Sequence, residues 1–445
     1  MKKVSVIAAA VVGVLAAGTV SAAQVDYHGY FRAGFGANAD GGSQYCYGNG
    51  GPTTFGHAVG RLGDECDVYG ELALNVNEAW TAQDGGTFNL HTLLAFGTYE
   101  DGGLDYRGNS FQSIGRDPAD PWSGQRASFR EAWADYSMAN GMKLWAGNRY
   151  YGRKDIHILD MYYVNNSGNG VGIENIDLGF AKFHAAAVQH KWKAPVMKDV
   201  GGELVPVEGT QVYSTANTFD LRLTGIETNE GGSMEFILLG AQPSHTDAQK
   251  DQENNPDGNF GDYGLDKFGV SFTAEHTQGH SLGFNKAAVQ ISTEGYAWAG
   301  FVGNHLGDSY NMETGQEGRK SYRFIDWGVV EGEKWNLGYS FVYAQLDKGT
   351  DGDDATAMSI VARPGYKWSE TMSTILEVGY FQQDFGADWG AEKQDLNKIT
   401  IAQQWQAGDN FWARPAIRVF ASKYSGDLAV EKNDLMFGAQ VEAWW

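Results

Sequence analysis

The sequence predicts an all-β chain, an 18-stranded antiparallel transmembrane β-barrel with an inward-folded constriction loop. The first observation is the strand pattern of the last eleven residues, which runs to the final residue. One face of that strand is apolar and carries Phe437, Ala439, Val441, Ala443 and Trp445. The other face carries Gly438, Gln440, Glu442 and Trp444. Such alternation is typical of a barrel strand with lipid on one side and a wet lumen on the other.

The second observation is that strand patterns recur at short spacing, with no helical period. We expect about eighteen strands, an even number as in single-chain bacterial barrels. In chain order they cover residues 25–37, 67–76, 88–99, 127–138, 143–149, 172–180, 183–189, 218–228, 233–242, 269–276, 281–292, 322–330, 335–345, 357–367, 372–383, 398–406, 411–422 and 435–445.

The third observation is the alternating length of the connections. Short connections include residues 140–141, 229–232 and 332–334, whereas long ones include residues 101–126 and 190–217. Short periplasmic turns and long external loops are typical of outer-membrane barrels, and a two-sheet sandwich has no reason to alternate so regularly. The long loops are rich in Gly, Asp and Asn, so we do not expect a second domain.

The composition agrees with a barrel and excludes one class of partner. The mean hydropathy is only −0.39, because alternation conceals the apolar residues of barrel strands. A β-rich soluble secreted protein has a similar composition, so this observation supports the barrel without proving it. The net charge of −22 is opposite to the basic face that nucleic-acid binding requires, so no nucleic-acid partner is expected.

The N-terminus predicts export. Residues 1–22 have a charged start at Lys2 and Lys3, an apolar core and a small-residue cleavage site, which together predict a signal peptide before a barrel domain of residues 23–445. Two cysteines, Cys46 and Cys66, lie close together in this exported chain, which favours a disulfide within one loop. Two cysteines without a histidine cluster make a poor metal site, and no cofactor is expected.

Aromatic rings recur on the predicted lumenal face beside charged groups. Alternation places Tyr30 beside Arg32, Tyr69 beside Glu71, Phe284 beside Lys286, and Trp412 beside Arg414. The same rule places Phe411 outward. Sugar rings stack their C–H faces on aromatic rings, and their hydroxyls form hydrogen bonds with ionised side chains. A row of rings with charged groups alongside can therefore bind and pass a sugar chain. The alternative is that these rings pack against inward loops or form interfacial girdles.

The loop of residues 150–163 is dense in tyrosine and charge. If it folds inward, Arg153, Asp155, Asp160 and Tyr162 form a constriction. Paired carboxylates also raise a glycosidase interpretation. A general acid needs a desolvated pocket, which a wet pore does not readily provide, so the chain is not expected to be an enzyme. His157 is expected to form hydrogen bonds rather than to bind a metal.

Long strings of the chain resemble the maltoporin family of maltodextrin-selective outer-membrane channels. The similarity covers nearly the whole mature chain. It is densest at Val25-Asp-Tyr-His-Gly-Tyr-Phe-Arg32, Arg61-Leu-Gly-Asp-Glu-Cys-Asp-Val-Tyr-Gly-Glu-Leu72, Phe129-Arg-Glu131, Trp145-Ala-Gly-Asn-Arg-Tyr-Tyr151, Gly172-Ile-Glu-Asn-Ile-Asp-Leu-Gly-Phe180, Thr273-Ala-Glu-His-Thr-Gln278, Ile401-Ala-Gln-Gln-Trp-Gln-Ala-Gly-Asp409, Trp412-Ala-Arg-Pro-Ala-Ile-Arg-Val-Phe420 and the terminal segment 437–445.

The resemblance implies an eighteen-stranded barrel, a homotrimer and an aromatic lane called the greasy slide. From the outside to the periplasm, the lane would consist of Trp122, Tyr69, Tyr30, Trp444, Trp412 and Phe284. The polar tracks beside it would consist of Arg32, Arg61, Glu71, Arg130, Arg153, Asp155 and Asp160. Trp122 would reach into the neighbouring subunit, Tyr162 would face the slide across the constriction, and Cys46 and Cys66 would match the family's loop disulfide.

The chain departs from the family in three places. The segment between the cysteines is longer than in enteric members, residues 423–434 form a shorter final loop, and Lys154 replaces a usual histidine. Because of the first two changes, the sequence does not decide whether the protein serves as a phage receptor or whether it discriminates between long dextrins.

The sequence therefore predicts a passive channel of the bacterial outer membrane for maltose and maltodextrins, through which small ions also leak. The expected partners are these sugars, membrane lipid and two further copies of the chain, with a periplasmic maltose-binding protein and phage as further candidates. Three alternatives remain: a pore for another saccharide such as sucrose, an outer-membrane glycoside hydrolase, and an adhesive barrel without conductance.

Overall fold

The structure is a computed structural model that describes most of the predicted mature chain. The described residues are 23–48, 51–65, 68–98, 125–200, 203–244, 268–302, 306–307, 309–310, 318–349, 353–389 and 393–445. The predicted signal peptide at residues 1–22 lies outside these residues, as do Cys66 and Trp122.

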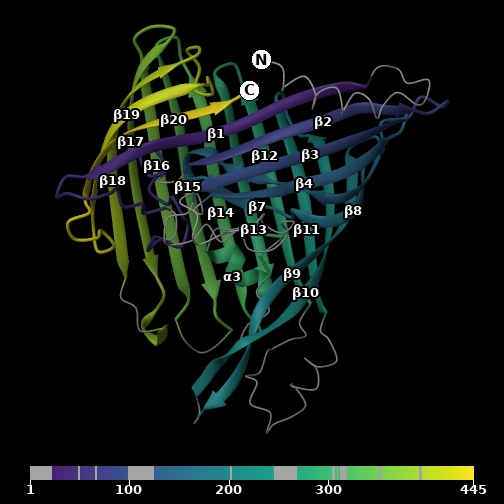
Figure 1. The fold of residues 1–445 in the computed structure, drawn as a ribbon, viewed down its shortest axis with the longest axis horizontal. Helices are drawn as coiled ribbons and strands as arrows, with labels where there is room; N and C mark the ends of the chain where they lie inside the picture. The colour runs from purple at the N-terminus through teal and green to yellow at the C-terminus, as the bar shows by residue number, and fades with distance from the viewer. Residues whose placement is uncertain are drawn as a thin grey trace, which may run out of the picture.

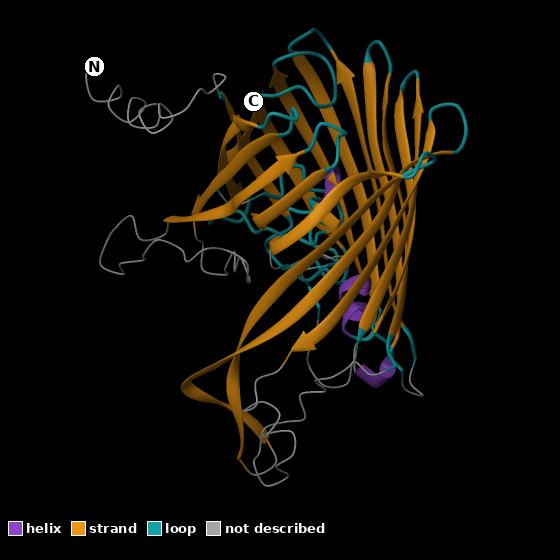
Figure 2. Cartoon of the chain, turned by 90° about the vertical axis from the view of Figure 1, so that its right-hand side faces the viewer, coloured by secondary structure: helices purple, strands orange, loops and turns teal. Residues whose placement is uncertain are grey.

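Nearly every described element is a strand (Figure 2). In chain order the elements are β1 (Gln24–Asn38), β2 (Tyr69–Thr81), β3 (Thr87–Thr98), β4 (Gln125–Ser137), β5 (Lys143–Arg149), β6 (Lys154–Ile156), η1 (His157–Leu159), β7 (Met161–Val164), β8 (Gly168–Asp177), β9 (Lys182–Val200), β10 (Glu203–Glu227), β11 (Gly232–Ser244), β12 (Gly269–His280), β13 (Gly283–Thr293), α3 (Gly295–Phe301), β14 (Lys320–Glu331), β15 (Trp335–Asp347), β16 (Ala355–Lys367), β17 (Met372–Asp384), η2 (Ala387–Trp389), β18 (Gln394–Gln406), β19 (Ala416–Ser425) and β20 (Leu435–Trp444).

Eighteen of these strands form one closed antiparallel sheet, which confirms the predicted fold class. Successive strands pair around the barrel, and the last strand returns to the first with Tyr30 opposite Trp444 and Asn38 opposite Met436. In Figure 1 the yellow β20 accordingly lies beside the purple β1. A closed sheet leaves no strand edge with unpaired backbone groups, which a lipid environment requires. No helix among the described residues is long and apolar enough to cross a membrane.

Two predicted boundaries were wrong in an informative way. Residues 190–217 were expected to be a loop, but β9 and β10 continue their ladder into them as far as Val200 and Glu203, with Trp192 opposite Ser214 and Met197 opposite Pro206. The strand expected at residues 411–422 begins only at Ala416, because Pro415 has no N–H to continue the ladder.

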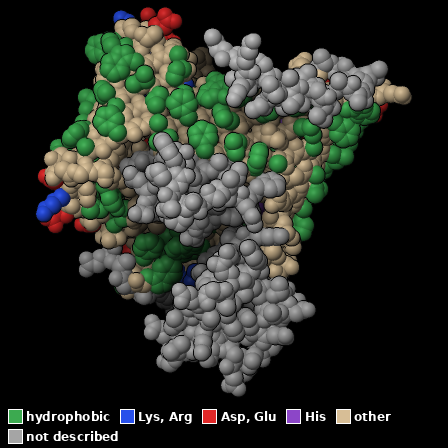
Figure 3. All heavy atoms as spheres, viewed as in Figure 1, with side chains coloured by type: hydrophobic (Ala, Val, Ile, Leu, Met, Phe, Trp, Pro, Cys, Tyr) green, Lys and Arg blue, Asp and Glu red, His purple; other side chains and the backbone are tan. Residues whose placement is uncertain are grey.

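The sheet separates an apolar outside from a polar inside. Val289 and Ile291 of β13 are each 47% exposed on the outer face, whereas their inward neighbours Gln290 and Ser292 are buried. The same alternation exposes Ile399 and Ile401 of β18. Figure 3 shows hydrophobic side chains spread over the outer face in view. This is the surface expected of strands that contact lipid.

Three connections fold inside the barrel and fill part of it. They are residues 51–65 after β1, residues 150–167 with β6, η1 and β7, and residues 294–302, 306–307 and 309–310 with α3. Their apolar side chains are fully or nearly fully buried: Phe55, Val59, Ile156, Ile158, Leu159, Tyr163, Tyr296 and Phe301. The loop of residues 150–163 was predicted to fold inward, and this is confirmed. The inward path of residues 51–65 was not predicted.

Candidate functional site

Three rings of the predicted lane lie on adjacent strands with their side chains on the lumenal face. Tyr30 of β1 is opposite Trp444 of β20 on one side and opposite Glu71 of β2 on the other. Its ring lies 6.1 Å from the ring of Tyr69, between centroids. All three rings are only partly buried, so each keeps a surface that a ligand can contact.

The fourth ring, Trp412, lies in the turn before β19, where strand alternation does not apply. It is connected to the wall by His157 of η1, whose ring lies 5.0 Å from Trp412 and 5.9 Å from Trp444. The Arg414 guanidinium stacks 4.3 Å from the centre of the Trp444 ring. Desolvation by burial, together with the positive Arg61, holds the pKa of His157 well below its usual range, so the imidazole is neutral at pH 7.

Phe284 lies on a different part of the barrel. It faces the lumen near the start of β13 and packs edge-on against Trp327 of β14 at 5.1 Å. Strands β14 to β18 separate it from β19, and no ring contact joins it to Trp412 within the described residues. The sixth predicted ring, Trp122, lies outside these residues. The structure therefore brings four of the six predicted rings together along one wall, and Phe284 stands apart.

Phe411 corrects the prediction that it faces outward. It is 8% exposed and packs inside the barrel, 6.4 Å from His157 and 4.9 Å from Trp412. The prediction was wrong because residues 411–415 form a turn, in which successive side chains no longer alternate between two faces.

Charged groups line the same wall beside the rings. Arg61 donates to the Tyr30 hydroxyl at 3.2 Å and to Glu442 Oε1 at 2.8 Å. Arg32 donates to Glu65 at 3.0 Å and to Asp160 Oδ2 at 3.2 Å. Burial alone would raise the pKa of Asp160, but Arg61 and Arg32 outweigh it and hold that pKa well below its usual range. Asp160 is therefore a fixed negative charge, not a proton donor.

A second charged group forms at the constriction. The Arg153 guanidinium lies between two tyrosine rings, 4.1 Å from the centre of Tyr150 and 4.2 Å from that of Tyr162. Tyr150 donates its hydroxyl proton to Glu71 at 2.9 Å and accepts from Arg130 Nε at 2.8 Å. These contacts join β2, β4 and the inward loop into one cluster.

Comparison with known proteins decides the family. The LamB porin family matches residues 25–445. A maltoporin of Hahella chejuensis is 39% identical over 433 residues, covering 96% of this chain and 94% of that protein. The chain belongs to the LamB porin family. It is therefore a sugar-selective channel of the bacterial outer membrane and not an enzyme, which sets aside the hydrolase and adhesin alternatives.

The solved structures that match this porin are distant from it. OccAB2 of Acinetobacter baumannii is 8% identical, with a TM-score of 0.48 and coverage of 96% of this chain and 98% of that one. OprD of Pseudomonas aeruginosa is also 8% identical, with a TM-score of 0.46 and coverage of 97% and 96%. At this level of similarity they carry no inference about the site of the porin.

The inward loop of the porin is fixed to the opposite wall by buried charge. Glu275 of β12 is 2% exposed and accepts from Tyr163 at 2.6 Å and from Lys154 Nζ at 2.9 Å. Lys154 also donates to Glu235 of β11 at 2.7 Å. Arg323 of β14 donates to the backbone carbonyl of Tyr163 at 3.0 Å. Lys154 thus anchors the loop to the wall.

The sequence interpretation missed Glu65 and the role of Glu442. Glu442 was placed on the lumenal face, but its three arginine partners, Arg61, Arg414 and Arg418, come from three separate segments. Alternation along a strand predicts the face that a single residue occupies. It does not predict partners from distant segments, and Arg61 lies 381 positions from Glu442 in the sequence.

Among the described residues, no group of three or more His, Cys, Asp or Glu side chains is arranged to hold a metal ion. Cys46 is not a free thiol in the structure, which agrees with the predicted pairing. Its predicted partner Cys66 lies outside the described residues, so the disulfide itself stays a prediction.

Proposed function

We propose that this porin conducts maltose and maltodextrins by facilitated diffusion along Tyr69, Tyr30, Trp444 and Trp412. The observation that carries the proposal is the position of these rings on one wall, each partly exposed and each beside a charged group. Phe284 is the proposed exit contact, and Trp122 the proposed entry contact from a neighbouring copy in a homotrimer.

The physical basis is that each sugar unit presents two kinds of surface. Its C–H faces stack on aromatic rings, and its hydroxyls exchange hydrogen bonds with ionised groups. The proposed tracks, Arg32, Arg61, Glu71, Arg130, Arg153, Asp155 and Asp160, supply donors and acceptors of both signs. Because several similar sites follow one another, a sugar unit can leave one contact as it gains the next, and no single site needs to hold it tightly.

The test is to reconstitute the purified porin in a planar lipid bilayer and titrate maltohexaose while ion current is recorded. We expect the current to fall saturably as the sugar occupies the lane. Sucrose at the same concentrations tests the competing saccharide specificity and is expected to block more weakly. Equal or stronger block by sucrose would contradict the preference for maltodextrins, and current unaffected by either sugar would contradict binding in the lane.

A further inference from the structure

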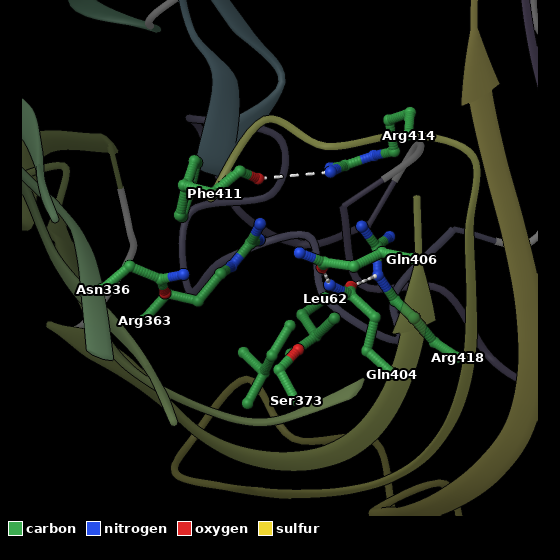
Figure 4. A pocket seen from close by; sticks show the side chains of 10 residues that line it. Leu62, Asn336, Arg363, Ser373, Gln404, Gln406, Phe411, Arg414 and Arg418 are labelled. Atoms are coloured by element: carbon green, nitrogen blue, oxygen red, sulfur yellow. Dashed lines mark hydrogen bonds between the residues drawn. The ribbon is translucent and has the colours of Figure 1, made fainter. Parts of the chain in front are cut away.

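A small cavity lies beside the turn that carries Trp412, and none of the proposed lane rings lines it. Its walls are the inner face of β15 to β19, the inward loop 51–65 and the turn 407–415. Figure 4 shows Arg363 and Asn336 entering from one side and Arg418 and Gln404 from the other. The cavity leaves about 20 Å³ for the centres of water-sized molecules, which is room for one or two of them. A sugar ring does not fit.

The cavity is lined by hydrogen-bond donors that the protein leaves partly unused. Arg363 donates through Nε to Glu377 at 2.5 Å and through Nη2 to the Ile158 carbonyl at 3.5 Å. Arg418 donates through Nε to Gln404 at 2.5 Å and through Nη2 to Glu442 at 3.1 Å. Within the described part of the chain, neither Nη1 has a hydrogen-bond partner.

The Asn336 side-chain amide has no partner among the described residues either. It is 8% exposed and lines the same cavity. The site therefore offers two arginine N–H groups and one amide. Two oriented guanidinium groups favour a negatively charged ligand.

The positively charged side chains around the cavity also outnumber the carboxylates that pair with them. Arg363, Arg414 and Arg418 line it, and Lys398 and Arg61 pack behind them. The carboxylates that pair with these five cations are Glu377, Glu442 and Glu65.

The third of these carboxylates is itself shared, because Glu65 also pairs with Arg32. Burial together with the neighbouring arginines lowers the pKa of Arg414 to about 10, so the guanidinium is still charged at pH 7. Arginine does not relieve the imbalance by losing its proton near neutrality. An excess of buried positive charge is costly unless a counter-charge enters.

We propose that this cavity binds a chloride ion, held by Arg363 and Arg418. A monatomic anion fits the free space, matches the unused N–H donors and compensates the excess positive charge. None of the proposed lane rings lines the cavity, so the inference does not depend on how sugars move. The cavity also borders the turn of residues 407–415, where Arg414 donates to Glu442 and to the carbonyls of Phe411 and Ala413.

The direct test is to grow crystals of the purified porin in sodium bromide and to measure anomalous scattering at the bromine edge. We expect a peak between the Nη1 atoms of Arg363 and Arg418. Ordered water without an anomalous signal would overturn the proposal, as would bromide found only in the sugar lane.

A second test uses stability, since a ligand that binds only the folded state raises its melting temperature. At constant ionic strength, replacing gluconate by chloride is expected to raise the melting temperature of the wild type by roughly 1–3 °C. Arg363→Met is expected to lose this shift, and the milder Asn336→Leu to reduce it in case the first variant folds poorly.

The matched control is Arg323→Met, which removes a buried arginine of β14 that does not line the cavity. It is expected to keep the chloride-dependent shift even if it melts at a lower temperature. If the chloride-dependent shift persists in Arg363→Met and Asn336→Leu, the anion binds elsewhere. The same conclusion follows if Arg323→Met loses the shift to the same extent.

Discussion

Two walls of this barrel share the same alternation of residues but differ in what covers their lumenal face. On the wall of β20, β1 and β2, the lumenal rings Trp444, Tyr30 and Tyr69 are only partly buried. On the wall of β12 to β16, lumenal residues such as Glu275, Ile325 and Ser359 are buried. The inward loops account for the difference, because they bury the second wall but contact the first through side chains such as Arg61 and Asp160 that leave its rings partly exposed.

The difference shows that inward orientation alone does not make a residue part of the pore. A lumenal side chain contributes to conduction only where no loop covers it. The covered wall instead supports the loops that narrow the channel. Mutations on the covered wall are therefore expected to change the channel width, and mutations on the open wall to change the affinity for sugar.

The largest effect is expected on the covered wall, at Glu275. Glu275→Ala removes the acceptor of both Tyr163 and Lys154 and leaves Lys154 with Glu235 alone. Removing one partner of a buried charge pair costs about 3–5 kcal/mol. We expect the constriction loop to detach, so that single-channel conductance rises and the open channel becomes noisier in bilayer recordings.

Glu235→Ala is the matched control, because it removes the other acceptor of Lys154. The Glu235 side chain is 22% exposed, so this pair is expected to contribute only about 1 kcal/mol or less. Its conductance is expected to stay near that of the wild type. If both variants conduct like the wild type, Glu275 does not anchor the loop.

The next effect is expected on the open wall, at the exposed tryptophans. Trp444→Ala and Trp412→Ala each remove one stacking surface, and such aromatic contacts are worth about 1 kcal/mol. The maltohexaose concentration for half-maximal block is therefore expected to rise by roughly fivefold in each variant. Titration of sugar block measures this, with conductance without sugar as the check that the pore is intact.

Trp133 of β4 provides the control for these variants. It faces the lumen, but His91 stacks on it at 3.8 Å and the Arg149 guanidinium lies 4.3 Å from its centre. Because these groups occupy its ring faces, a sugar has no surface there. Trp133→Ala is expected to leave sugar block unchanged. If Trp133→Ala loses as much affinity for the sugar as Trp444→Ala, sugar binding is not restricted to the open wall.

Much of the open wall could be predicted from the sequence, because the period of two in a strand fixes the face of each residue. The rule placed Tyr30, Tyr69, Trp444 and Phe284 inward without any knowledge of the fold. It also placed Phe411 outward, which was wrong because a turn replaces the strand there. Alternation thus works only as far as the hydrogen-bond ladder continues.

The contacts of the inward loops could not be predicted in the same way. The contacts of Lys154 with Glu275 and of Arg61 with Glu442 join residues 121 and 381 positions apart. Nothing in the local pattern of either partner identifies the other. The position of His157 between two tryptophans depends likewise on how the loop packs, although its place in an inward loop was expected.

A smaller effect is expected from changing the stacked cation at the constriction. Arg153→Lys keeps the positive charge but loses the planar group that lies between Tyr150 and Tyr162. We expect sugar block to weaken by about two- to fivefold, as for the loss of part of one stacking contact. Ion selectivity, measured from the reversal potential in a salt gradient, is expected to stay the same. A change in selectivity without a change in block would assign Arg153 to ion conduction instead.

The smallest effect concerns two carboxylates of the same loop that respond oppositely to their surroundings. Burial and the charge of Asp160 raise the pKa of Asp155 above its usual value. Arg61 and Arg32 lower the pKa of Asp160 despite its burial. As pH falls from 7, Asp155 therefore takes up a proton first, at a pH above the ordinary carboxyl value of about 3.9, while Asp160 stays ionised.

The constriction thus loses one negative charge in that pH range, and the preference for cations over anions is expected to decrease. Reversal potentials in a potassium chloride gradient between pH 7 and pH 4 measure this change. Asp155→Asn should show the lower preference at every pH and no step. Asp160→Asn should keep the step but shift it to lower pH, because the like charge that raises the pKa of Asp155 is gone. An unchanged step in Asp155→Asn would show that another group carries the titration.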